Sequence, residues 1–253
     1  SNHLLDVIAA DNTGTTFIAK HEITNFTGST AADNITIGTT SAYIGGSNIG
    51  TIAAGDGSDT LTLNIDTTNA DLNSVTEVET INLNFKAAAG DLTVKGGGGS
   101  DGVITATTTN LTGGVTAGVY TIGTSVFTDL GTSGRVVDAS GLEGSMVATF
   151  GDNALDVDNV NYMVTITGGK GTADVVNASL GTAAGGDTGA FTMSGVETLS
   201  VGVDSNASTI NFANVTGLTK TVITDDGAVD ISNIALTAVG VTATNVQNNA
   251  KCR

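Results

Sequence analysis

Short stretches in which apolar and polar residues alternate recur along the whole chain. In residues 61–65 (LTLNI), three aliphatic side chains fall on one side of an extended backbone, while Thr62 and Asn64 fall on the other. A period of two residues is the pattern of a strand with one buried and one solvated face. The same pattern predicts strands in residues 35–37, 81–85, 92–94, 164–166, 199–203, 210–212 and 229–231.

The composition favours strands and turns over helices. Of the 253 residues, 40% are hydrophobic, which is more than a disordered chain carries, and only 13% are charged, which is too few to cover the wet faces of long helices. Thr and Val are stiff at χ1 and favour strands, while the 35 Gly residues supply turns. Two alanine-bearing stretches, residues 87–91 and 182–186, are too short for a stable helix. We therefore predict an all-β protein.

Recurring phrases indicate a repeat architecture. Residues 78–83 (VETINL) reappear as residues 196–201 (VETLSV), and short strands recur about every ten residues. The expected inward positions hold aliphatic residues of similar size, and Thr, Asn and Gly stack well on copies of themselves. We predict an elongated parallel β-solenoid with irregular coils, and a β-sandwich is the alternative. Residues 1–253 are expected to form a single elongated β domain, a fragment of a larger protein.

The charge balance bears on the partners of the chain. Eight Lys and Arg residues stand against 25 Asp and Glu residues, which gives a formal charge of −17 and excludes the basic footprint that nucleic-acid binding needs. Divalent cations, calcium above all, suit a surface rich in carboxylates. No stretch approaches the ~20 apolar residues of a membrane-spanning helix, so we expect no transmembrane segment.

Few residues offer other chemistry. Cys252 is the single cysteine and cannot form an internal disulfide, so we interpret it as part of a frayed terminus. His3 and His21 have no second His or Cys at ligand spacing, which argues against zinc. A glycosidase would need paired carboxylates in a cleft lined with aromatic rings, and the chain has no Trp and three Tyr. We therefore expect no enzymatic activity.

Glycine and aspartate cluster in a motif that precedes three expected strands. Residues 96–104 fit the nine-residue pattern G-G-x-G-x-D-x-U-x at every specified position, where U is a large apolar residue. Residues 54–62 fit with Ala54 in place of the first Gly, and residues 168–176 fit with one extra residue before the Asp. Glycine permits dihedrals that turn carbonyl oxygens inward, and Asp adds a hard anionic oxygen of the kind that Ca²⁺ binds. An ordinary turn before a strand is the alternative at each copy. The candidate calcium ligands are Asp59, Asp101 and Asp174.

The three motifs, the two V-E-T phrases and the turn at residues 214–218 resemble those of RTX-type bacterial surface-layer (S-layer) proteins. The resemblance implies a β-solenoid that is exported by type I secretion, tiles the cell surface and needs Ca²⁺ to crystallise. It also implies that glycines of the motif supply carbonyl ligands. The calcium-site residues carried over in this way are Gly55, Gly57, Asp59, Gly96, Gly97, Gly99, Asp101, Gly168, Gly169 and Asp174.

These observations lead to one expected function and two alternatives. We expect an extracellular, non-enzymatic segment that self-assembles into a calcium-dependent protective lattice on the bacterial cell surface. Its expected partners are copies of itself and surface polysaccharide or lipopolysaccharide. The first alternative is an adhesin or glycan-binding module of an RTX adhesin or autotransporter. The second is a β-helix polysaccharide lyase or hydrolase, for which Glu79, Glu143 and Glu197 are the carboxylates to consider.

Overall fold

We describe the protein from a computed structural model of the 253-residue chain. The structure describes residues 6–9, 13–20, 25–38, 49–66, 69–86, 91–96, 106–127, 134–152, 155, 164–180, 188–203, 208–224, 229–233, 240–244 and 251–252. Regular structure in these ranges consists of strands, and no helix occurs there, so the prediction of an all-β protein is confirmed. Accordingly, this part of the chain holds no helix with the length and apolar character to span a membrane.

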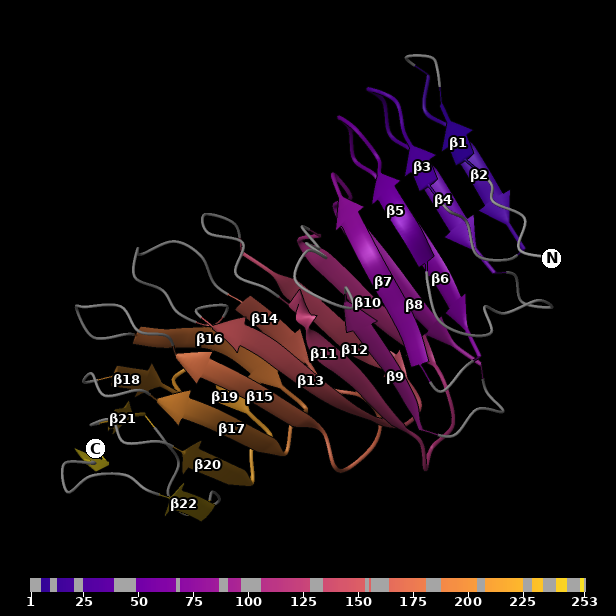
Figure 1. Ribbon diagram of the computed structural model, residues 1–253. Coiled ribbons are helices and arrows are strands. Elements are labelled where there is room, and N and C mark those ends of the chain that lie inside the picture. Colours follow the sequence, from indigo (N-terminus) through magenta and orange to yellow (C-terminus); the bar gives the residue numbers. More distant parts are fainter. Residues whose placement is uncertain are drawn as a thin grey trace.

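The strands form two long parallel sheets (Figure 1). Sheet A contains β1 (Asp6–Ile8), β3 (Asn25–Thr27), β5 (Ile49–Ala53), β7 (Asn69–Thr76), β9 (Leu92–Gly96), β11 (Val119–Phe127), β13 (Ser145–Asp152), β15 (Val175–Leu180), β17 (Thr198–Val203), β20 (Lys220–Thr224) and β22 (Gly240–Thr244). Sheet B contains β2 (Thr16–Ala19), β4 (Asn34–Ile37), β6 (Thr60–Ile65), β8 (Thr80–Phe85), β10 (Thr108–Gly113), β12 (Val136–Leu142), β14 (Val164–Thr167), β16 (Thr188–Ser194), β18 (Ser208–Asn211), β21 (Val229–Ser232) and β23 (Lys251–Cys252). The short strand β19 (Val215–Thr216) also pairs with β16.

The chain alternates between the two sheets, so two successive strands make one coil. Strand β6, for example, pairs in parallel with β4 of the coil before and β8 of the coil after. The coils stack along one axis, and the two termini lie at opposite ends of the stack (Figure 1). The predicted elongated parallel β-solenoid is confirmed, and the alternative β-sandwich is wrong.

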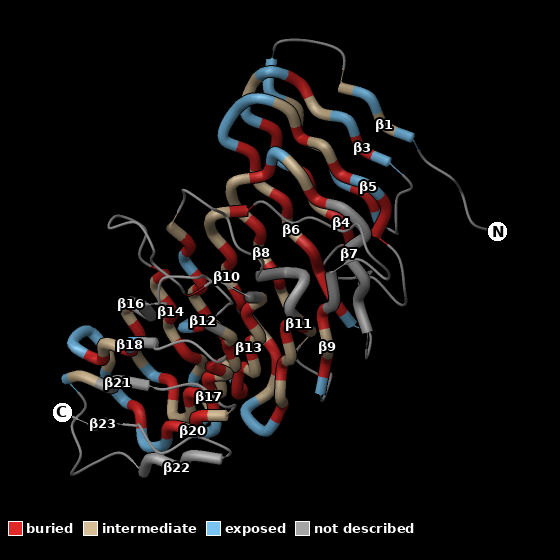
Figure 2. The backbone as a smooth tube through the Cα atoms, turned by 60° about the vertical axis from the view of Figure 1, so that its left-hand side comes forward, coloured by how far each residue is buried: buried red, intermediate tan, exposed pale blue. Residues whose placement is uncertain are grey.

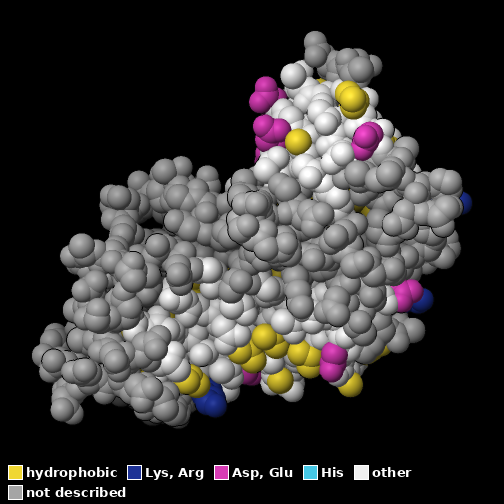
Figure 3. Space-filling model, viewed as in Figure 1, with side chains coloured by type: hydrophobic (Ala, Val, Ile, Leu, Met, Phe, Trp, Pro, Cys, Tyr) yellow, Lys and Arg dark blue, Asp and Glu magenta, His cyan; other side chains and the backbone are white. Residues whose placement is uncertain are grey.

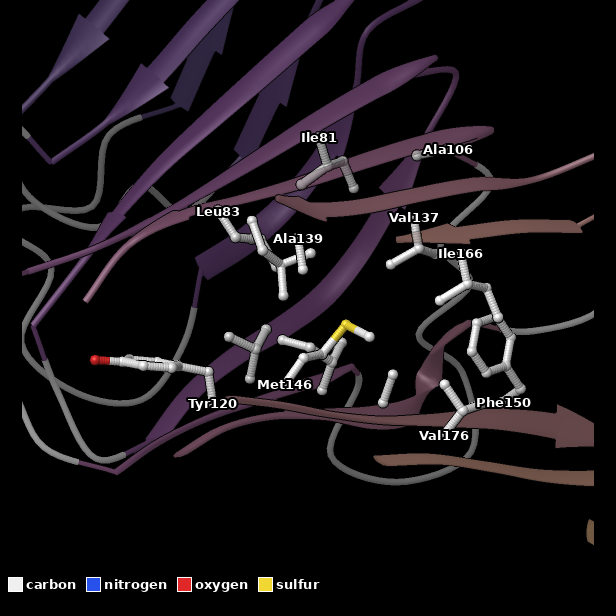
Figure 4. Close-up of a cluster of buried hydrophobic side chains, with 14 of the residues drawn as sticks. Ile81, Leu83, Ala106, Tyr120, Val137, Ala139, Met146, Phe150, Ile166 and Val176 are labelled. Atoms are coloured by element: carbon white, nitrogen blue, oxygen red, sulfur yellow. The ribbon is translucent and has the colours of Figure 1, made fainter. Parts of the chain in front are cut away.

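The core is a thin layer between the two sheets. Leu63, Leu83 and Leu111 hold the same position in three successive coils and are fully buried. Side chains of the two sheets point toward one another across this layer, as Val137 from β12 and Met146 from β13 do (Figure 4). Burial alternates along the strands, with inward residues buried and outward residues partly exposed (Figure 2). The alternation seen in the sequence therefore corresponds to the two faces of each strand.

The outer face of sheet B carries a ladder of amides and hydroxyls. Nδ2 of Asn84 donates to Oδ1 of Asn64 at 2.7 Å, and Nδ2 of Asn110 donates to Oδ1 of Asn82 at 2.8 Å. Asn82 in turn donates to Oγ1 of Thr62 at 3.3 Å. Each bond joins one coil to the next, so the outward polar residues also stabilise the stack.

One arrangement of strands and corners occurs twice. The N-terminal module, residues 49–85, contains β5 to β8, and the C-terminal module, residues 164–203, contains β14 to β17. Each module has a Gly/Asp motif after its first strand and a V-E-T phrase around the start of its last strand. However, β5 belongs to sheet A and β14 belongs to sheet B. The two modules are therefore offset by half a coil, and their matching corners lie on opposite edges of the solenoid.

Candidate metal centres

Three acidic side chains hold one corner position in successive coils. Asp33, Asp59 and Glu79 directly precede β4, β6 and β8, which lie side by side in sheet B. The N–H of Thr15 donates to Oδ1 of Asp33 at 2.5 Å, that of Asp33 donates to Oδ1 of Asp59 at 2.6 Å, and that of Asp59 donates to Oε2 of Glu79 at 2.6 Å. Each carboxylate thus caps a backbone donor one coil earlier. We call Asp33, Asp59 and Glu79 the N-terminal carboxylate row.

The C-terminal module repeats this arrangement on the opposite edge. Asp174 and Glu197 directly precede β15 and β17 of sheet A. The N–H of Met146 donates to Oδ1 of Asp174 at 2.7 Å, and that of Asp174 donates to Oε2 of Glu197 at 2.8 Å. The backbone matches as well, because Glu79 N lies 3.2 Å from Asp59 O and Glu197 N lies 3.2 Å from Asp174 O. We call Asp174 and Glu197 the C-terminal carboxylate row.

One oxygen in each row is buried without a hydrogen-bond partner. The side chains of Asp59 and Asp174 are fully buried, and the Oδ2 atom of each receives no hydrogen bond from the residues that the structure describes. A buried anionic oxygen without a donor costs free energy unless a proton or a cation neutralises it. The two atoms therefore mark the corners as places where positive charge would be stabilised.

The surroundings of both Asp residues favour a neutral carboxyl. Burial raises the pKa of Asp59, and the carboxylates of Glu79, Asp33 and Glu77 raise it further, against the lowering effect of the hydrogen bond from Asp33 N. Burial likewise raises the pKa of Asp174, against hydrogen bonds from two backbone N–H groups. In the absence of a cation, both groups thus keep a proton at higher pH than an exposed Asp does.

Asp33 differs from Asp59 although it is also fully buried. Its Oδ1 atom accepts the N–H of Thr15, and its Oδ2 atom accepts the N–H of Ser29 at 2.8 Å. Both oxygens of Asp33 therefore have backbone donors. Within the N-terminal row, Asp59 is therefore the residue whose buried carboxylate oxygen a cation would stabilise.

Two further acidic residues lie at the N-terminal corner. Glu77 and Asp56 are exposed, and Oε2 of Glu77 accepts the N–H of Gly55 at 3.2 Å. Acidic side chains are visible along the corresponding edge of the N-terminal part, at the left in the view of Figure 3. This edge is thus a concentration of negative charge around the buried Asp59.

Glycine lets successive corner turns stack in direct backbone contact. A Cβ atom on Gly168 would lie 1.8 Å from the carbonyl oxygen of Gly195. Gly55 has a left-handed φ of 91°, and a Cβ atom there would lie 2.0 Å from the carbonyl oxygen of Ser29. The glycines of the motif are therefore needed for close packing of coils, whatever else they bind.

The structure places part of the predicted calcium site. Asp59 and Asp174 stand in the two carboxylate rows, and the turns before them contain the predicted residues Gly55, Gly57, Gly168 and Gly169. Gly169 donates its N–H to Oδ1 of Asp174 at 2.9 Å. This glycine is thus seen acting as a donor to the carboxylate, and the binding of Ca²⁺ by glycine carbonyls stays a prediction.

The third copy of the motif is described only at its first residue. Gly96 ends strand β9. Gly97, Gly99 and Asp101 lie outside the described residues.

Asp33, Glu79 and Glu197 were not among the predicted ligands. The repeated V-E-T phrase was the signal for two of them, because its Glu directly precedes a strand in both modules. Glu79 and Glu197 are also two of the carboxylates named for the alternative polysaccharide-cleaving function. The structure places each Glu one coil beyond the Asp of the Gly/Asp motif.

The donor chemistry of the two rows fits a hard divalent cation. Ca²⁺ prefers carboxylate and carbonyl oxygens, and the Oδ2 atoms of Asp59 and Asp174 are buried anionic oxygens without a donor. In the described ranges, no group of three or more His, Cys, Asp or Glu side chains is arranged to hold a metal ion. An ion at either corner would therefore need backbone carbonyl oxygens or water to complete its coordination.

Comparison with known proteins gave no relative of the chain. No family model, curated protein or solved structure matches it. The geometry of the two corners and the motifs of the sequence are therefore the basis for a functional proposal.

Proposed function

We propose that the chain is a structural segment of a calcium-dependent surface layer on a bacterial cell. The observation that carries this proposal is the partnerless buried oxygen of Asp59 and Asp174, which recurs at matching corners of two modules in an elongated solenoid. Calcium bound there would offset the cost of burying the charge. The resemblance of the Gly/Asp motif to that of RTX-type S-layer proteins supports the same function.

The net charge gives calcium a second effect. At −17, copies of the chain repel one another in solution. Ca²⁺ that binds the corners and screens the acidic edges reduces this repulsion and allows copies to associate. In this proposal the chain is exported by type I secretion and has no catalytic role. It contacts copies of itself and surface polysaccharide or lipopolysaccharide.

Thermal unfolding tests the calcium part of the proposal. We expect the midpoint to rise by several degrees between excess EGTA and millimolar CaCl₂, because a ligand that binds only the folded state stabilises it. MgCl₂ at the same concentration serves as the control for screening by a divalent ion. Equal midpoints in EGTA and CaCl₂ would contradict calcium binding.

Electron microscopy of the purified chain tests the lattice part. We expect ordered sheets in CaCl₂ and dispersed particles in EGTA. Dispersed particles under both conditions would rule out self-assembly of this chain.

A second candidate function rests on the outer face of sheet B. Asn82, Asn84 and Asn110 are partly exposed there and present a row of uncharged amides, and such groups can hydrogen-bond neutral sugars. The chain would then be a glycan-binding module of an adhesin. Binding on a glycan array that Asn82→Lys abolishes and that Asn177→Lys on sheet A leaves intact would favour this function.

A further inference from the structure

The two carboxylate rows share one hydrogen-bond frame but differ in the charge around it. Asp33 and Met146 hold matching places, because the N–H of each donates to the Oδ1 atom of the buried Asp in the next coil. The N-terminal corner therefore has an additional carboxylate where the C-terminal corner has a neutral thioether.

The turns that lead into β8 and β17 also differ in charge, and again the N-terminal corner is the more negative one. Glu77 and Gly195 each stand two residues before the Glu of their row, and both have left-handed backbone, with φ of 57° and 64°. The backbone thus has a left-handed φ at both places. Only the N-terminal corner gains a carboxylate from it.

The Gly/Asp turns differ even in the sign of their charge. Asp56 and Lys170 are both the third residue of their motif. Asp56 is exposed at the N-terminal corner. Lys170 forms an ion pair with Glu143 at the C-terminal corner. Three matched positions therefore make the N-terminal corner the more negative one.

Carboxylates near a bound cation attract it even where their oxygens are not ligands. The attraction between a divalent ion and a carboxylate grows as their separation falls, and the affinity of calcium sites rises with the negative charge of the site. Asp33, Asp56 and Glu77 supply this charge around Asp59. Around Asp174, the charge of Glu143 is offset by Lys170.

We infer that the two corners bind Ca²⁺ with unequal affinity, so that the corner of Asp59 and Glu79 fills first and the corner of Asp174 and Glu197 fills at higher calcium concentration. This inference rests on the calcium part of the proposed function. It makes the solenoid respond to calcium in two steps, with the N-terminal module stabilised before the C-terminal module.

Isothermal titration calorimetry of the full chain with CaCl₂ alone, after removal of EGTA, tests this order. We expect two classes of sites whose dissociation constants differ by about tenfold or more. Asp59→Asn removes the tighter class, and Asp174→Asn removes the weaker class. Asp66→Asn, which deletes one charge from an exposed ion pair with Lys86, is the matched control and leaves both classes in place.

A double substitution at the N-terminal corner tests whether the surrounding charge causes the unequal affinity. It changes exposed residues and leaves the buried carboxylates in place. The double variant Asp56→Lys with Glu77→Gly gives this corner the residues of the other corner at two of the three matched positions, and Gly suits the left-handed backbone of position 77. We expect the dissociation constant of the tighter class to rise by about tenfold. An unchanged thermal midpoint in EGTA would show that the variant is folded.

The outcomes separate this inference from the function on which it rests. No binding heat, together with no effect of calcium on the thermal midpoint, would overturn both. A single class of sites, or loss of the tighter class in Asp174→Asn, would overturn the unequal filling and leave calcium binding intact. If Asp59→Asn does not fold, an unaltered affinity in the Asp56→Lys/Glu77→Gly double variant would overturn the inference.

Discussion

Asp59 and Asp174 each use one carboxylate oxygen to cap a backbone N–H and bury the other without a donor. An acceptor alone would be supplied equally well by Asn, which carries no charge. The choice of Asp therefore adds a buried charge that capping does not require. This excess charge is the reason to expect a cation at these residues.

Replacement of the buried Asp by Asn separates capping from cation binding. Asp59→Asn keeps the Oδ1 acceptor and removes the charge. In EGTA at neutral pH, we expect it to raise the free energy of unfolding by about 1 kcal/mol, because an unpaired buried charge is lost. In millimolar CaCl₂, we expect the variant to be less stable than the native chain.

Denaturant titration measures both effects, and Asp66→Asn is again the control. An equal loss of stability in EGTA and in CaCl₂ would show that Asp59 acts only as a structural cap.

The raised pKa of Asp59 and Asp174 predicts a pH dependence in EGTA. Because the folded-state pKa lies above the unfolded value of 3.8, the folded state retains protons that the unfolded state releases. The stabilisation is complete below the unfolded pKa and is lost as pH rises through the folded pKa. We expect the unfolding free energy of the native chain, relative to the Asp59→Asn/Asp174→Asn double variant, to fall from acidic to neutral pH. A constant difference would contradict the raised pKa values.

At the scale of elements, the strands followed from the sequence because alternation is a local signal. Residues 61–65 and 81–85 were predicted as strands and lie in β6 and β8. The parallel stack also followed, because the expected inward positions hold aliphatic residues of similar size and because Thr, Asn and Gly stack well on copies of themselves. Neither prediction depends on the number of residues in each coil.

The carboxylate rows did not follow from the sequence, because their alignment depends on coil length. Asp33 and Asp59 are 26 residues apart, whereas Asp59 and Glu79 are 20 residues apart. No fixed period brings these residues to one corner. The half-coil offset was hidden for a related reason, since the two V-E-T phrases look alike but precede β8 of sheet B and β17 of sheet A.

The close stacking of corner turns predicts unequal effects for two glycine substitutions. A Cβ atom on Gly168 would lie 1.8 Å from a backbone oxygen, so we expect Gly168→Ala to cost about 3 kcal/mol of stability. At Gly195 the nearest atom would be 3.7 Å away, so Gly195→Ala should cost only about 1 kcal/mol, from its left-handed φ. Denaturant unfolding measures both, and the reverse order would contradict the corner packing.

At the scale of the whole molecule, the described strands of each coil pair only with those of the coils beside it. Stability in such a stack is largely a sum of local terms and terms between neighbours. We therefore expect Gly168→Ala to speed hydrogen exchange in the C-terminal module while residues 49–85 keep their native rates.

Gly28→Ala is the matched variant for the other half, because its Cβ atom would lie 1.9 Å from the carbonyl oxygen of Ala54. We expect it to show the opposite pattern of exchange, which mass spectrometry resolves by segment. Uniform loss of protection in either variant would mean that the solenoid unfolds as one cooperative unit.

The second module begins at β14, nine strands after β5, and nine is an odd number. With an even number, both carboxylate rows would lie on the same edge of the solenoid. The odd number places the two carboxylate rows on opposite edges of the solenoid, with one shared hydrogen-bond frame and unequal surrounding charge. In the proposed surface layer, each molecule would then have one calcium corner on each of two opposite edges, and a row of copies would extend in both directions.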